Sequence, residues 1–360
     1  MLFNLKTNLI MKTNLFSLTA MLLAGIMISC QQAEEPQVNE GKAEISTRAY
    51  GDKSPKMVVY VETNDTNPLN AGDYELSNGK AFVDIVELFA SNLQKRSVDG
   101  VIQPVLKLND RMVRVLEPDP SAPTTTGYHK YVKPLQQKGI KVLLTVLGNW
   151  DGISVASMND TQTTQFAQIL AYVVDRYGLD GIGFDDEYSG TSVTVPGSYG
   201  TLINKLENLM PAGKLITVFQ WGSYGSSQIN YTQGSMIDYA YHGYFGSTNF
   251  ESSSNISGVT NDRWSPISLN LGGNYDDSAL ISIYENAMNA AEGQYGAMMT
   301  FNIRRSSDVD PLPVFDMLAQ GAYEDEVSVA STPDNAGDRP QDWAIIPAEY
   351  YITIDDVNGN

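Results

Sequence analysis

The sequence predicts an α/β fold of the (β/α)8, or TIM, barrel class over residues 56–322. Short apolar runs alternate with amphipathic helical patterns along this stretch, as the repeated β/α units of such a barrel require. Several of these runs are apolar at almost every position, as expected of parallel strands that are covered on both faces. Eight such runs fit into this stretch, and its length is close to the size typical of the class.

The predicted strands differ in how clearly they are marked. Most are apolar runs bounded by turn residues. The second, Phe82–Asn92, is ambiguous by periodicity, but the Asn78-Gly79 turn signal before it favours a strand preceded by a turn. We therefore expect a reduced helix between strands one and two. In chain order the predicted strands are Met57–Glu62, Phe82–Asn92, Val142–Leu147, Gly181–Asp185, Leu215–Gln220, Tyr239–Tyr244, Ile267–Leu271 and Ala297–Asn302.

The clearest predicted helix is Thr161–Tyr177. Apolar side chains recur in it at helical spacing, Asn159 or Asp160 can cap its start, and Gly178 ends it. Similar or weaker patterns occupy Leu202–Met210, Ser278–Glu292 and Tyr128–Lys138. These helices would connect successive parallel strands.

The two ends of the chain differ from the predicted barrel. Residues 1–30 have the features of a lipoprotein signal peptide, in which an apolar run ends at a motif resembling a bacterial lipobox, with Cys30 as the lipidated residue. The polar linker, residues 31–55, resembles the surface-export signal of Bacteroidetes lipoproteins, because acids follow that cysteine closely. We therefore expect a bacterial outer-membrane lipoprotein exposed at the cell surface. Residues 323–360, with nine acidic residues against one basic residue, are predicted to be an acidic C-terminal tail, within which Trp343–Ile354 is apolar enough to dock on the barrel.

The composition excludes several classes of function. The formal net charge of −19 argues against a nucleic-acid partner, because phosphate binding requires clustered Lys and Arg. The two histidines, His129 and His242, are far apart, and together with one cysteine they argue against a zinc site or a Cys-His nucleophile. The sequence contains neither G-x-S-x-G nor G-x-G-x-x-G. We expect no metal and no cofactor.

Three consecutive acids end the fourth predicted strand, in LDGIGFDDEY at 179–188. Because side chains alternate along a strand, Gly183, Asp185 and Glu187 share one face, whereas Asp186 points the other way. Two carboxyls on one face, about 7 Å apart at their Cα atoms, cannot both ionise freely, so one is expected to hold a proton near neutral pH. Such a pair can cleave a glycosidic bond. Alternatively, the triplet only ends the strand and caps the next turn.

Several co-linear segments, including this one, resemble glycoside hydrolase family 18. The strand-four motif is similar to the D-G-x-D-x-D-x-E signature of that family, and the match is closer to its endo-β-N-acetylglucosaminidases of the Endo H and Endo F type. The resemblance covers roughly residues 57–322 and implies a TIM barrel. The segments are YVETNDTNPLNAGDY (60–74), PLQQKGIKVLLTVLGNWDG (134–152), YGLDGIGFDDEYS (177–189), DYAYHGYFG (238–246) and MMTFNI (298–303).

The resemblance implies a retaining endo-β-N-acetylglucosaminidase that cleaves the GlcNAc-β1,4-GlcNAc core of N-linked glycans by substrate-assisted catalysis. Glu187 matches the general acid/base, and Asp185 matches the aspartate that orients the N-acetyl group of the substrate. Tyr244 matches a tyrosine that hydrogen-bonds the same group. The partners implied are an N-glycan or glycoprotein and, through the lipid on Cys30, the outer membrane, with no nucleic acid. We expect a monomer.

Two departures from the family pattern matter: Gly183, and His242 with Gly243, which reshape the pocket near Tyr244. Gly183 stands where D-G-x-D-x-D-x-E has its second aspartate, which in the family tunes the charge at the position of Asp185. Either another group holds Asp185, or this carboxyl is more solvated here. The departure at Gly183 keeps a non-catalytic, cell-surface glycan-binding lipoprotein on the same barrel open as an alternative, and a family chitinase as a further one. Retention of both acids favours the enzyme.

Other side chains at predicted strand ends are candidates for lining a glycan cleft. They are Glu62, Asn149, Trp150, Gln220 and Asn302. Two further tryptophans, Trp221 and Trp264, are expected in the core.

Overall fold

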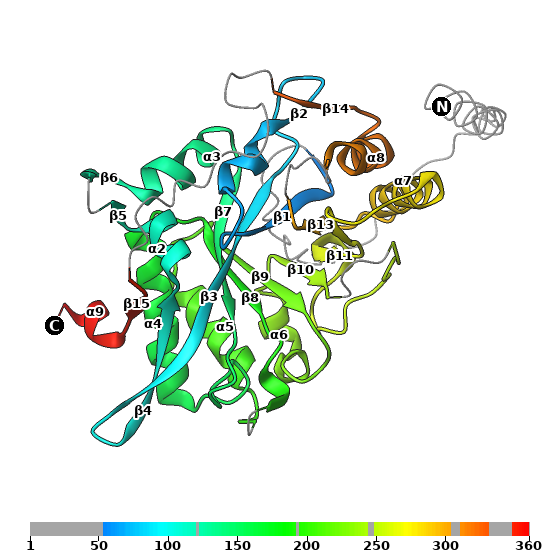
Figure 1. The fold of residues 1–360 in the computed structure, drawn as a ribbon. Coiled ribbons are helices and arrows are strands. Elements are labelled where there is room, and N and C mark those ends of the chain that lie inside the picture. The colour runs from blue at the N-terminus through cyan, green and yellow to red at the C-terminus, as the bar shows by residue number, and fades with distance from the viewer. Residues whose placement is uncertain are drawn as a thin grey trace, which may run out of the picture. The chain divides into compact units, whose positions relative to one another are not determined.

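Parallel strands form the centre of the fold (Figure 1). The structure is a computed structural model, and it describes residues 53–119, 122–191, 194–243, 248–303, 310–330 and 348–359. Among these residues, no helix is long and apolar enough to cross a membrane. The parallel strands are β1 (Lys56–Glu62), β3 (Ile85–Val98), β7 (Lys141–Leu147), β8 (Gly181–Asp185), β9 (Leu215–Gln220), β10 (Tyr239–His242), β11 (Trp264–Ser265), β12 (Ser268–Asn270) and β13 (Ala297–Phe301).

The parallel sheet closes almost completely on itself. Its strands pair in the order β11-β10-β9-β8-β7-β3-β1-β13-β12. The two ends of this path, β11 and β12, are halves of one stretch that is interrupted only at residues 266–267. The sheet therefore returns to its start as a nearly closed barrel, which confirms the predicted TIM class.

The predicted strands are all present, with small differences at their ends. The bounds predicted for the fourth and fifth strands are those of β8 and β9. The predicted seventh strand corresponds to β12, which is two residues shorter than Ile267–Leu271. β10 ends at His242, and Tyr244 lies outside the residues that the structure describes.

The connection between β1 and β3 has no α-helix, as predicted. It contains η1, a 3-10 helix (Pro68–Asp73), and the short strand β2 (Tyr74–Leu76). Asn67 caps η1, because its side-chain Oδ1 accepts a hydrogen bond from the Leu69 amide at 3.0 Å. The Asn78-Gly79 turn signal thus correctly predicted a connection between β1 and β3 without an α-helix.

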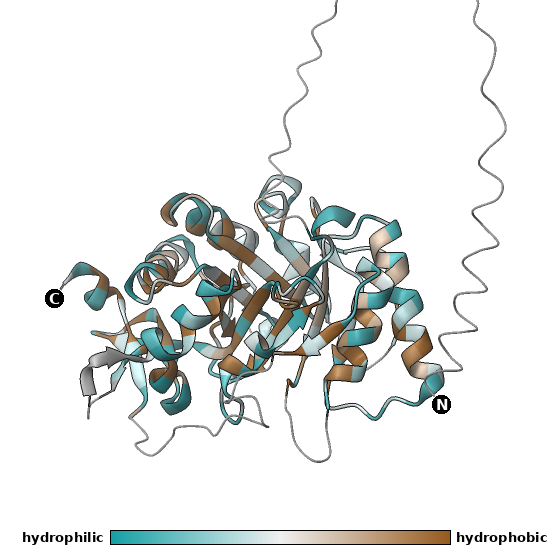
Figure 2. Cartoon of the chain, turned by 90° about the horizontal axis from the view of Figure 1, so that it is seen from above, coloured by the Kyte–Doolittle hydropathy of each residue, from teal (hydrophilic) through white to brown (hydrophobic). Residues whose placement is uncertain are grey.

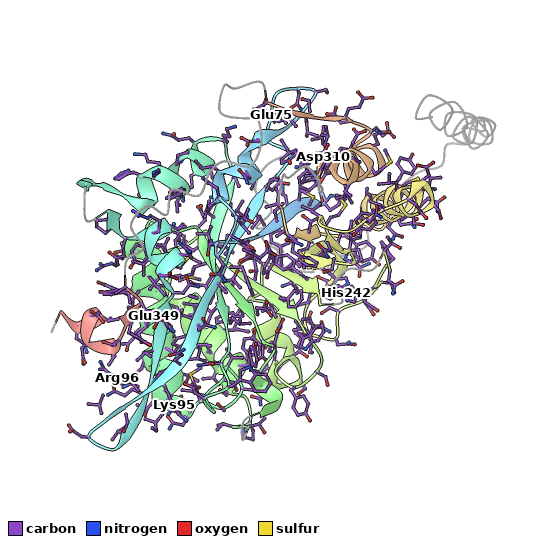
Figure 3. All side chains as sticks on the ribbon, in the orientation of Figure 1. Glu75, Lys95, Arg96, His242, Asp310 and Glu349 are labelled. Carbon is purple, nitrogen blue, oxygen red and sulfur yellow. The ribbon has the colours of Figure 1, made fainter. Side chains whose placement is uncertain are left out.

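A long hairpin beyond the barrel was not predicted. The C-terminal half of β3 leaves the parallel sheet and pairs antiparallel with β4 (Val101–Leu108), and Figure 1 shows the two strands extending away from the barrel. The strand β15 (Tyr350–Ile352), from the acidic C-terminal segment, pairs with the other edge of β4. Arg96 on the hairpin forms an ion pair with Asp355 at 2.8 Å, and Lys107 forms one with Glu349 at 2.7 Å. Arg96 and Glu349 are labelled in Figure 3. Part of the C-terminal segment therefore docks on this hairpin.

Helices cover the outside of the barrel. In the best predicted one, α4 (Asp160–Arg176), the Asn159 side chain and the Gln162 side chain form a reciprocal capping box. The other helices, η1 apart, are α2 (Asp110–Leu116), the π-helix η2 (Tyr128–Val132), α3 (Lys133–Gln137), η3 (Ser189–Thr191), α5 (Ser198–Leu209), η4 (Ser226–Gln228), α6 (Tyr231–Gly234), η5 (Asn261–Arg263), α7 (Asp277–Glu292), α8 (Leu312–Tyr323) and α9 (Ile354–Asn358). The remaining short strands are β5 (Pro118–Asp119), β6 (Ala122–Thr126) and β14 (Val327–Val329), which pairs with β2.

Apolar side chains are buried on both sides of the barrel wall. Figure 2 shows hydrophobic residues on the central strands and hydrophilic residues on the outer parts of the helices. The larger cluster lies between the strands and the helices. The smaller cluster fills the barrel interior with Val58, Tyr60, Ile85, Leu143, Leu215, Phe219, Tyr239, Tyr241, Ala297 and Met299. Because these positions alternate along their strands, they identify which other side chains point inward.

Candidate active site at the carboxyl ends of the barrel strands

The inward-facing side chains of the barrel strands are mostly apolar, but those near the carboxyl ends of the strands are polar. On β8 the inward positions are Gly181, Gly183 and Asp185, since they pair with the inward positions of β7 and β9. Glu187 follows two residues after Asp185, in the turn beyond the strand. The C-terminal end of a barrel is where enzymes of this fold carry their chemistry.

Asp185 is almost completely buried. Its side chain belongs to a residue that is only 2% exposed, and no residue that the structure describes donates a hydrogen bond to its Oδ1 atom. Burial raises the pKa of the Asp185 carboxyl well above its usual range, and the nearby Glu187, Asp186 and Glu87 carboxyls raise it further. A buried oxygen without a partner costs about 1–3 kcal/mol, and such costs are typical of functional sites.

Glu187 is half-buried at the mouth of the barrel. Burial raises the pKa of its carboxyl, and the charge of Asp186 raises it further. Both effects favour the protonated form, which is the form that a general acid needs. Partial exposure leaves the carboxyl accessible from solvent.

Asp186 points away from these two acids, as strand alternation predicts. Its Oδ1 atom accepts hydrogen bonds from the Ser189 hydroxyl at 2.6 Å and the Ser189 amide at 3.2 Å. It therefore fixes the turn after β8, so the capping role that the sequence suggested for the whole triplet applies to this residue.

A third buried acid, Glu87 on β3, was missed by the sequence analysis. Its Oε1 atom accepts hydrogen bonds from the Thr217 hydroxyl at 2.5 Å and from the Tyr241 hydroxyl at 3.3 Å, and its Oε2 atom accepts one from the Thr145 hydroxyl at 3.0 Å. Burial raises the pKa of Glu87 to about 7, although the three donors act in the opposite direction. The available signal was a single acid inside the apolar run IVELF at 85–89.

Glu87 occupies the space beside Gly183. A Cβ atom added to Gly183 would lie 2.3 Å from Glu87 Oε2 and 2.8 Å from the Thr217 hydroxyl oxygen. No side chain fits there without moving Glu87. The space that a side chain at position 183 would need is thus occupied by the carboxyl group of Glu87, from strand β3.

Three of the predicted cleft residues form hydrogen bonds with neighbouring strands and loops. Glu62 ends β1, and its Oε1 atom accepts a hydrogen bond from the Asn302 amide at 3.0 Å. The Asn302 side chain donates to Asn270 Oδ1 at 3.0 Å, so the ends of β1, β13 and β12 are tied together. The Gln220 side chain accepts hydrogen bonds from the Ser254 hydroxyl and the Asn255 amide. These contacts make Gln220 an anchor for the loop after β10.

The other two predicted cleft residues lie in the loop after β7. Asn149 accepts a hydrogen bond from the Trp150 amide through its Oδ1 atom at 2.8 Å. Trp150 is 73% exposed, and its ring meets the Tyr188 ring edge-on with 4.9 Å between centroids. Trp150 is therefore a surface aromatic next to the acidic motif.

Of the two tryptophans assigned to the core, one is not buried. Trp264 is 1% exposed, as predicted, and donates a hydrogen bond to the Glu251 carbonyl oxygen at 2.8 Å. Trp221, which directly follows β9, is 46% exposed, so its core assignment is wrong. Tyr224, in the same loop, is also exposed, and its ring packs close to Gly190. The physical reason is that the loop beyond β9 turns its aromatic rings toward solvent at the barrel mouth.

Some predicted residues are not tested by this geometry. Tyr244 and Cys30 lie outside the described residues. His242, at the end of β10 (Figure 3), is half-buried, and burial lowers the pKa of its imidazole. Within the described ranges, no group of three or more His, Cys, Asp or Glu side chains could hold a metal ion.

A cavity of about 840 Å³ lies at the opposite end of the barrel, around the start of β1. Lys53 and Asp84 line it and form an ion pair at 2.8 Å. At this face of a TIM barrel, ordered contacts generally serve stability. The cavity is therefore separate from the acids at the ends of β8.

Similarity to known proteins agrees with this geometry. The chain is 33% identical over 295 residues to endo-β-N-acetylglucosaminidase F1 of Elizabethkingia meningoseptica, covering 77% of this chain and 81% of that protein. It is also 33% identical over 265 residues to an endo-β-N-acetylglucosaminidase of Flavobacterium sp. (strain SK1022), covering 71% and 77%. The chain belongs to the endo-β-N-acetylglucosaminidases of glycoside hydrolase family 18. No family model matches it.

Solved structures of the family show the same fold. EndoBT-3987 of Bacteroides thetaiotamicron, solved with a Man5GlcNAc product, superposes with a TM-score of 0.57 at 24% identity. The match covers 79% of this chain, which spans 64% of the length of that one. The superposition supports the barrel topology described above.

Proposed function

We propose that the protein is a retaining endo-β-N-acetylglucosaminidase that cleaves between the two GlcNAc residues of the core of N-linked glycans. The observation that carries the proposal is the pair of inward acids at the end of β8, Asp185 and Glu187, in a chain of this family. Burial raises the pKa of both carboxyls. Two curated relatives of the chain are named as endo-β-N-acetylglucosaminidases.

In the first step, Glu187 acts as the general acid. Its proton passes to the glycosidic oxygen, and the C1–O bond to the leaving GlcNAc breaks. The carbonyl oxygen of the substrate's own acetamide group attacks C1 and forms an oxazolinium ion. Asp185 lies on the same strand face and orients the acetamide N–H, and its negative charge stabilises the positive charge that develops there. Tyr244 would hydrogen-bond the same group.

In the second step, the Glu187 carboxylate acts as the general base. It takes a proton from a water molecule, whose oxygen attacks C1 and opens the oxazolinium ring. The acetamide is regenerated, Glu187 is protonated again, and the product keeps its β configuration because C1 has been inverted twice. The developing cation also favours the charged form of Asp185, which burial disfavours in the free protein.

Aromatic rings near the acids, of which Trp150 and Tyr224 are exposed and Tyr188 is half-buried, support a glycan as the substrate. Trp150, Tyr188 and Tyr224 come from the loops after β7, β8 and β9, and the contacts of Trp150 with Tyr188 and of Tyr224 with Gly190 connect them. Flat apolar rings with polar neighbours suit the apolar faces of sugars. Glu62, Asn149, Gln220 and Asn302 lie at the ends of neighbouring strands, where their polar groups could contact sugar hydroxyls.

The non-catalytic alternative loses its main support. It rested on the missing aspartate at position 183, but the space beside Gly183 holds the Glu87 carboxylate. A protein that only binds glycans would not need a half-buried acid with a raised pKa at the position of Glu187.

Digestion of a glycoprotein with one defined N-glycan, followed by mass spectrometry of both products, tests this function. We expect the peptide to keep a single GlcNAc on its asparagine and the released glycan to carry the other. A matched digestion with Glu187→Gln should leave the glycoprotein intact. Release of chitin oligosaccharides with no cleavage of the glycoprotein would favour a chitinase, and tight binding without cleavage would favour the binding protein.

We also propose that the protein is a lipoprotein of the outer membrane, exposed at the cell surface and anchored through Cys30. The support is the sequence of residues 1–30 and the acids that follow them. A bacterial lipoprotein cysteine would carry several acyl chains, enough for stable anchoring. Membrane fractions should contain the natural protein but not Cys30→Ser, and protease added to intact cells should digest it. Membrane retention of Cys30→Ser would contradict the proposal.

We propose that the enzyme acts as a monomer. The acids, their hydrogen-bond donors and the exposed aromatic side chains all come from one barrel, so a second copy is not needed to complete the site. Sedimentation of a soluble form lacking residues 1–30 should give the mass of one chain, and a dimer would contradict this expectation.

A further inference from the structure

Glu87 is too specifically held to be an accidental core acid. A buried carboxyl without a role would be replaced at little cost by an apolar side chain, because burial penalises its charge. Here three hydroxyl donors, Thr145, Thr217 and Tyr241, converge on it from β7, β9 and β10. Its strand neighbours Ile85 and Phe89, on the same inward row, are apolar.

The position of this carboxyl is defined relative to the acidic motif. Its Oε2 atom lies where a side chain on Gly183 would begin, at 2.3 Å from the ideal Cβ position. Gly183 is the inward residue directly before Asp185 on β8. The Glu87 carboxyl therefore lies inside the barrel beside β8, one layer of side chains below Asp185.

The two carboxyls influence each other electrostatically. Glu87 is among the groups that raise the pKa of Asp185, after burial, Glu187 and Asp186. The titratable groups that face Glu87 from the neighbouring strands are Tyr60 on β1, Asp185 on β8 and Tyr241 on β10. From β7 and β9 it is faced by the hydroxyls of Thr145 and Thr217, which do not titrate in this range.

We infer that Glu87 is a positioning residue for Asp185 and supplies, from strand β3, the carboxyl that the family motif places at position 183. The inference rests on the proposed function. Gly183 and Glu87 form a complementary pair in which the carboxyl has moved to another strand and the glycine leaves the room that it needs. Because only one of two neighbouring buried carboxyls ionises readily, the charge of Asp185 depends on the state of Glu87.

The first test separates this role from a structural one with two substitutions of the same residue. Glu87→Ala removes the carboxyl and its packing, and we expect kcat to fall at least about tenfold with little change in KM. Glu87→Gln keeps the shape, so kcat should partly recover. In both variants Asp185 ionises more easily, and the acidic limb of the pH profile of kcat/KM should move to lower pH.

A matched control is Glu117→Gln. Glu117 also accepts hydrogen bonds from side chains, those of Arg176 and Tyr177, but it lies outside the barrel. Its substitution should lower the melting temperature without moving the pH profile. If Glu87→Gln behaved like this control, with a normal profile and normal kcat, the inference would be overturned.

The second test returns the carboxyl to β8. Gly183→Asp alone would force a side chain against Glu87 and Thr217, so we expect loss of both stability and activity. In the double variant Glu87→Ala with Gly183→Asp, the new carboxyl occupies the space that Glu87 vacates. The double variant should be more active than either single variant, and its acidic limb should return toward that of the natural enzyme.

The outcomes distinguish this inference from the proposed function. Activity of the natural protein and its loss in Glu187→Gln test the function alone. If the natural enzyme is active but the double variant is no better than the single ones, Glu87 does not stand in for the missing carboxyl. If the natural protein cleaves no N-glycan, the proposed function is at fault, and the pH dependence of the thermal stability of Glu87→Gln still reports whether Glu87 couples to Asp185.

Discussion

The mouth of the barrel and the layer beneath it hold their carboxyl groups in different ways. Beneath the mouth, Glu87 is fully buried and receives three hydrogen bonds from hydroxyl groups. At the mouth, Asp185 is almost as buried, yet its Oδ1 atom has no donor among the residues that the structure describes. The difference teaches that the deeper acid is fixed by hydrogen bonds within the protein, whereas the outer acid keeps the free oxygen that its proposed role toward the substrate requires.

This contrast extends to Glu187, which is the most accessible of the three acids. Its carboxyl is half-buried, so its pKa is raised while solvent and substrate can still reach it. The depth of each acid in the barrel thus matches its proposed role. Glu87, the deepest, is fixed by hydrogen bonds, Asp185 would orient the substrate, and Glu187, at the mouth, would donate the proton. The following predictions test whether the three positions differ in the way that this order requires.

The largest effect is expected at the mouth. Glu187→Gln keeps the shape of the side chain but has no proton to donate, so kcat should fall by about 10²–10⁴-fold. Because this side chain is only half-buried, the melting temperature should change little. Steady-state kinetics on a glycopeptide together with a thermal melt would measure both, and near-normal turnover would exclude Glu187 as the acid.

Asp185→Asn should have opposite effects on activity and stability. The negative charge beside the oxazolinium ion is lost, and kcat should fall by about 10²–10³-fold. The folded protein no longer carries a buried carboxyl with a poorly satisfied oxygen, so the free energy of unfolding should rise by about 1 kcal/mol at neutral pH. Denaturant unfolding of this variant beside the natural enzyme would show a fall in stability if Asp185 were a structural residue instead.

The pH dependence of stability should identify Glu87. The pKa of Glu87 is raised to about 7 in the folded protein from its ordinary value of 4.5, so the folded state binds more protons between these values and stability falls as pH rises through this window. One pKa unit corresponds to about 1.36 kcal/mol, so the whole contribution is roughly 3 kcal/mol, fully present below pH 4.5 and lost above pH 7. The free energies of unfolding of the natural protein and Glu87→Gln should therefore have different slopes against pH, and parallel slopes would contradict the assignment.

The smallest effect is expected from the surface aromatic. Trp150→Ala removes an exposed ring that contacts Tyr188, so it should raise KM by about two- to tenfold and leave kcat nearly unchanged, because stacking contacts contribute about 0.5–1.5 kcal/mol. Tyr172→Ala, an aromatic substitution on the outer helix α4, is the control and should alter neither constant. A fall in kcat with unchanged KM would place Trp150 in the chemistry instead.

Local signals in the sequence predicted most of the barrel. The capping residue Asn159, the helical spacing that follows it and the apolar strand that leads to Asp185 all act over short distances along the chain. The expectation that Asp185 and Glu187 share one face followed from strand alternation alone. These elements could be predicted because propensity and tertiary packing agree in them.

Most of the remainder depends on contacts between distant segments. The pairing of β15 with β4 could not be predicted, because the two strands lie some 240 residues apart. The hairpin of β3 and β4 is local and was overlooked although Asp99-Gly100 is a hairpin-turn signal, since β4 contains Pro104 and alternates weakly. The importance of Glu87 could not be predicted, since the space beside Gly183 is visible only when β3 and β8 are placed in one barrel. Trp221 was assigned to the core on residue type, but the exposure of a ring after a strand is decided by the path of its loop.

The most direct test of the central claim is to follow one reaction with two readouts. Cleavage of a defined N-glycopeptide by the natural enzyme, observed by proton NMR during the first minutes, reports the configuration at C1 of the released glycan before it equilibrates. Mass spectrometry of the same sample reports what remains on the asparagine. The account predicts the β anomer first and one GlcNAc left on the peptide, with neither product formed by Glu187→Gln. Initial release of the α anomer, or equal cleavage by the variant, would contradict it.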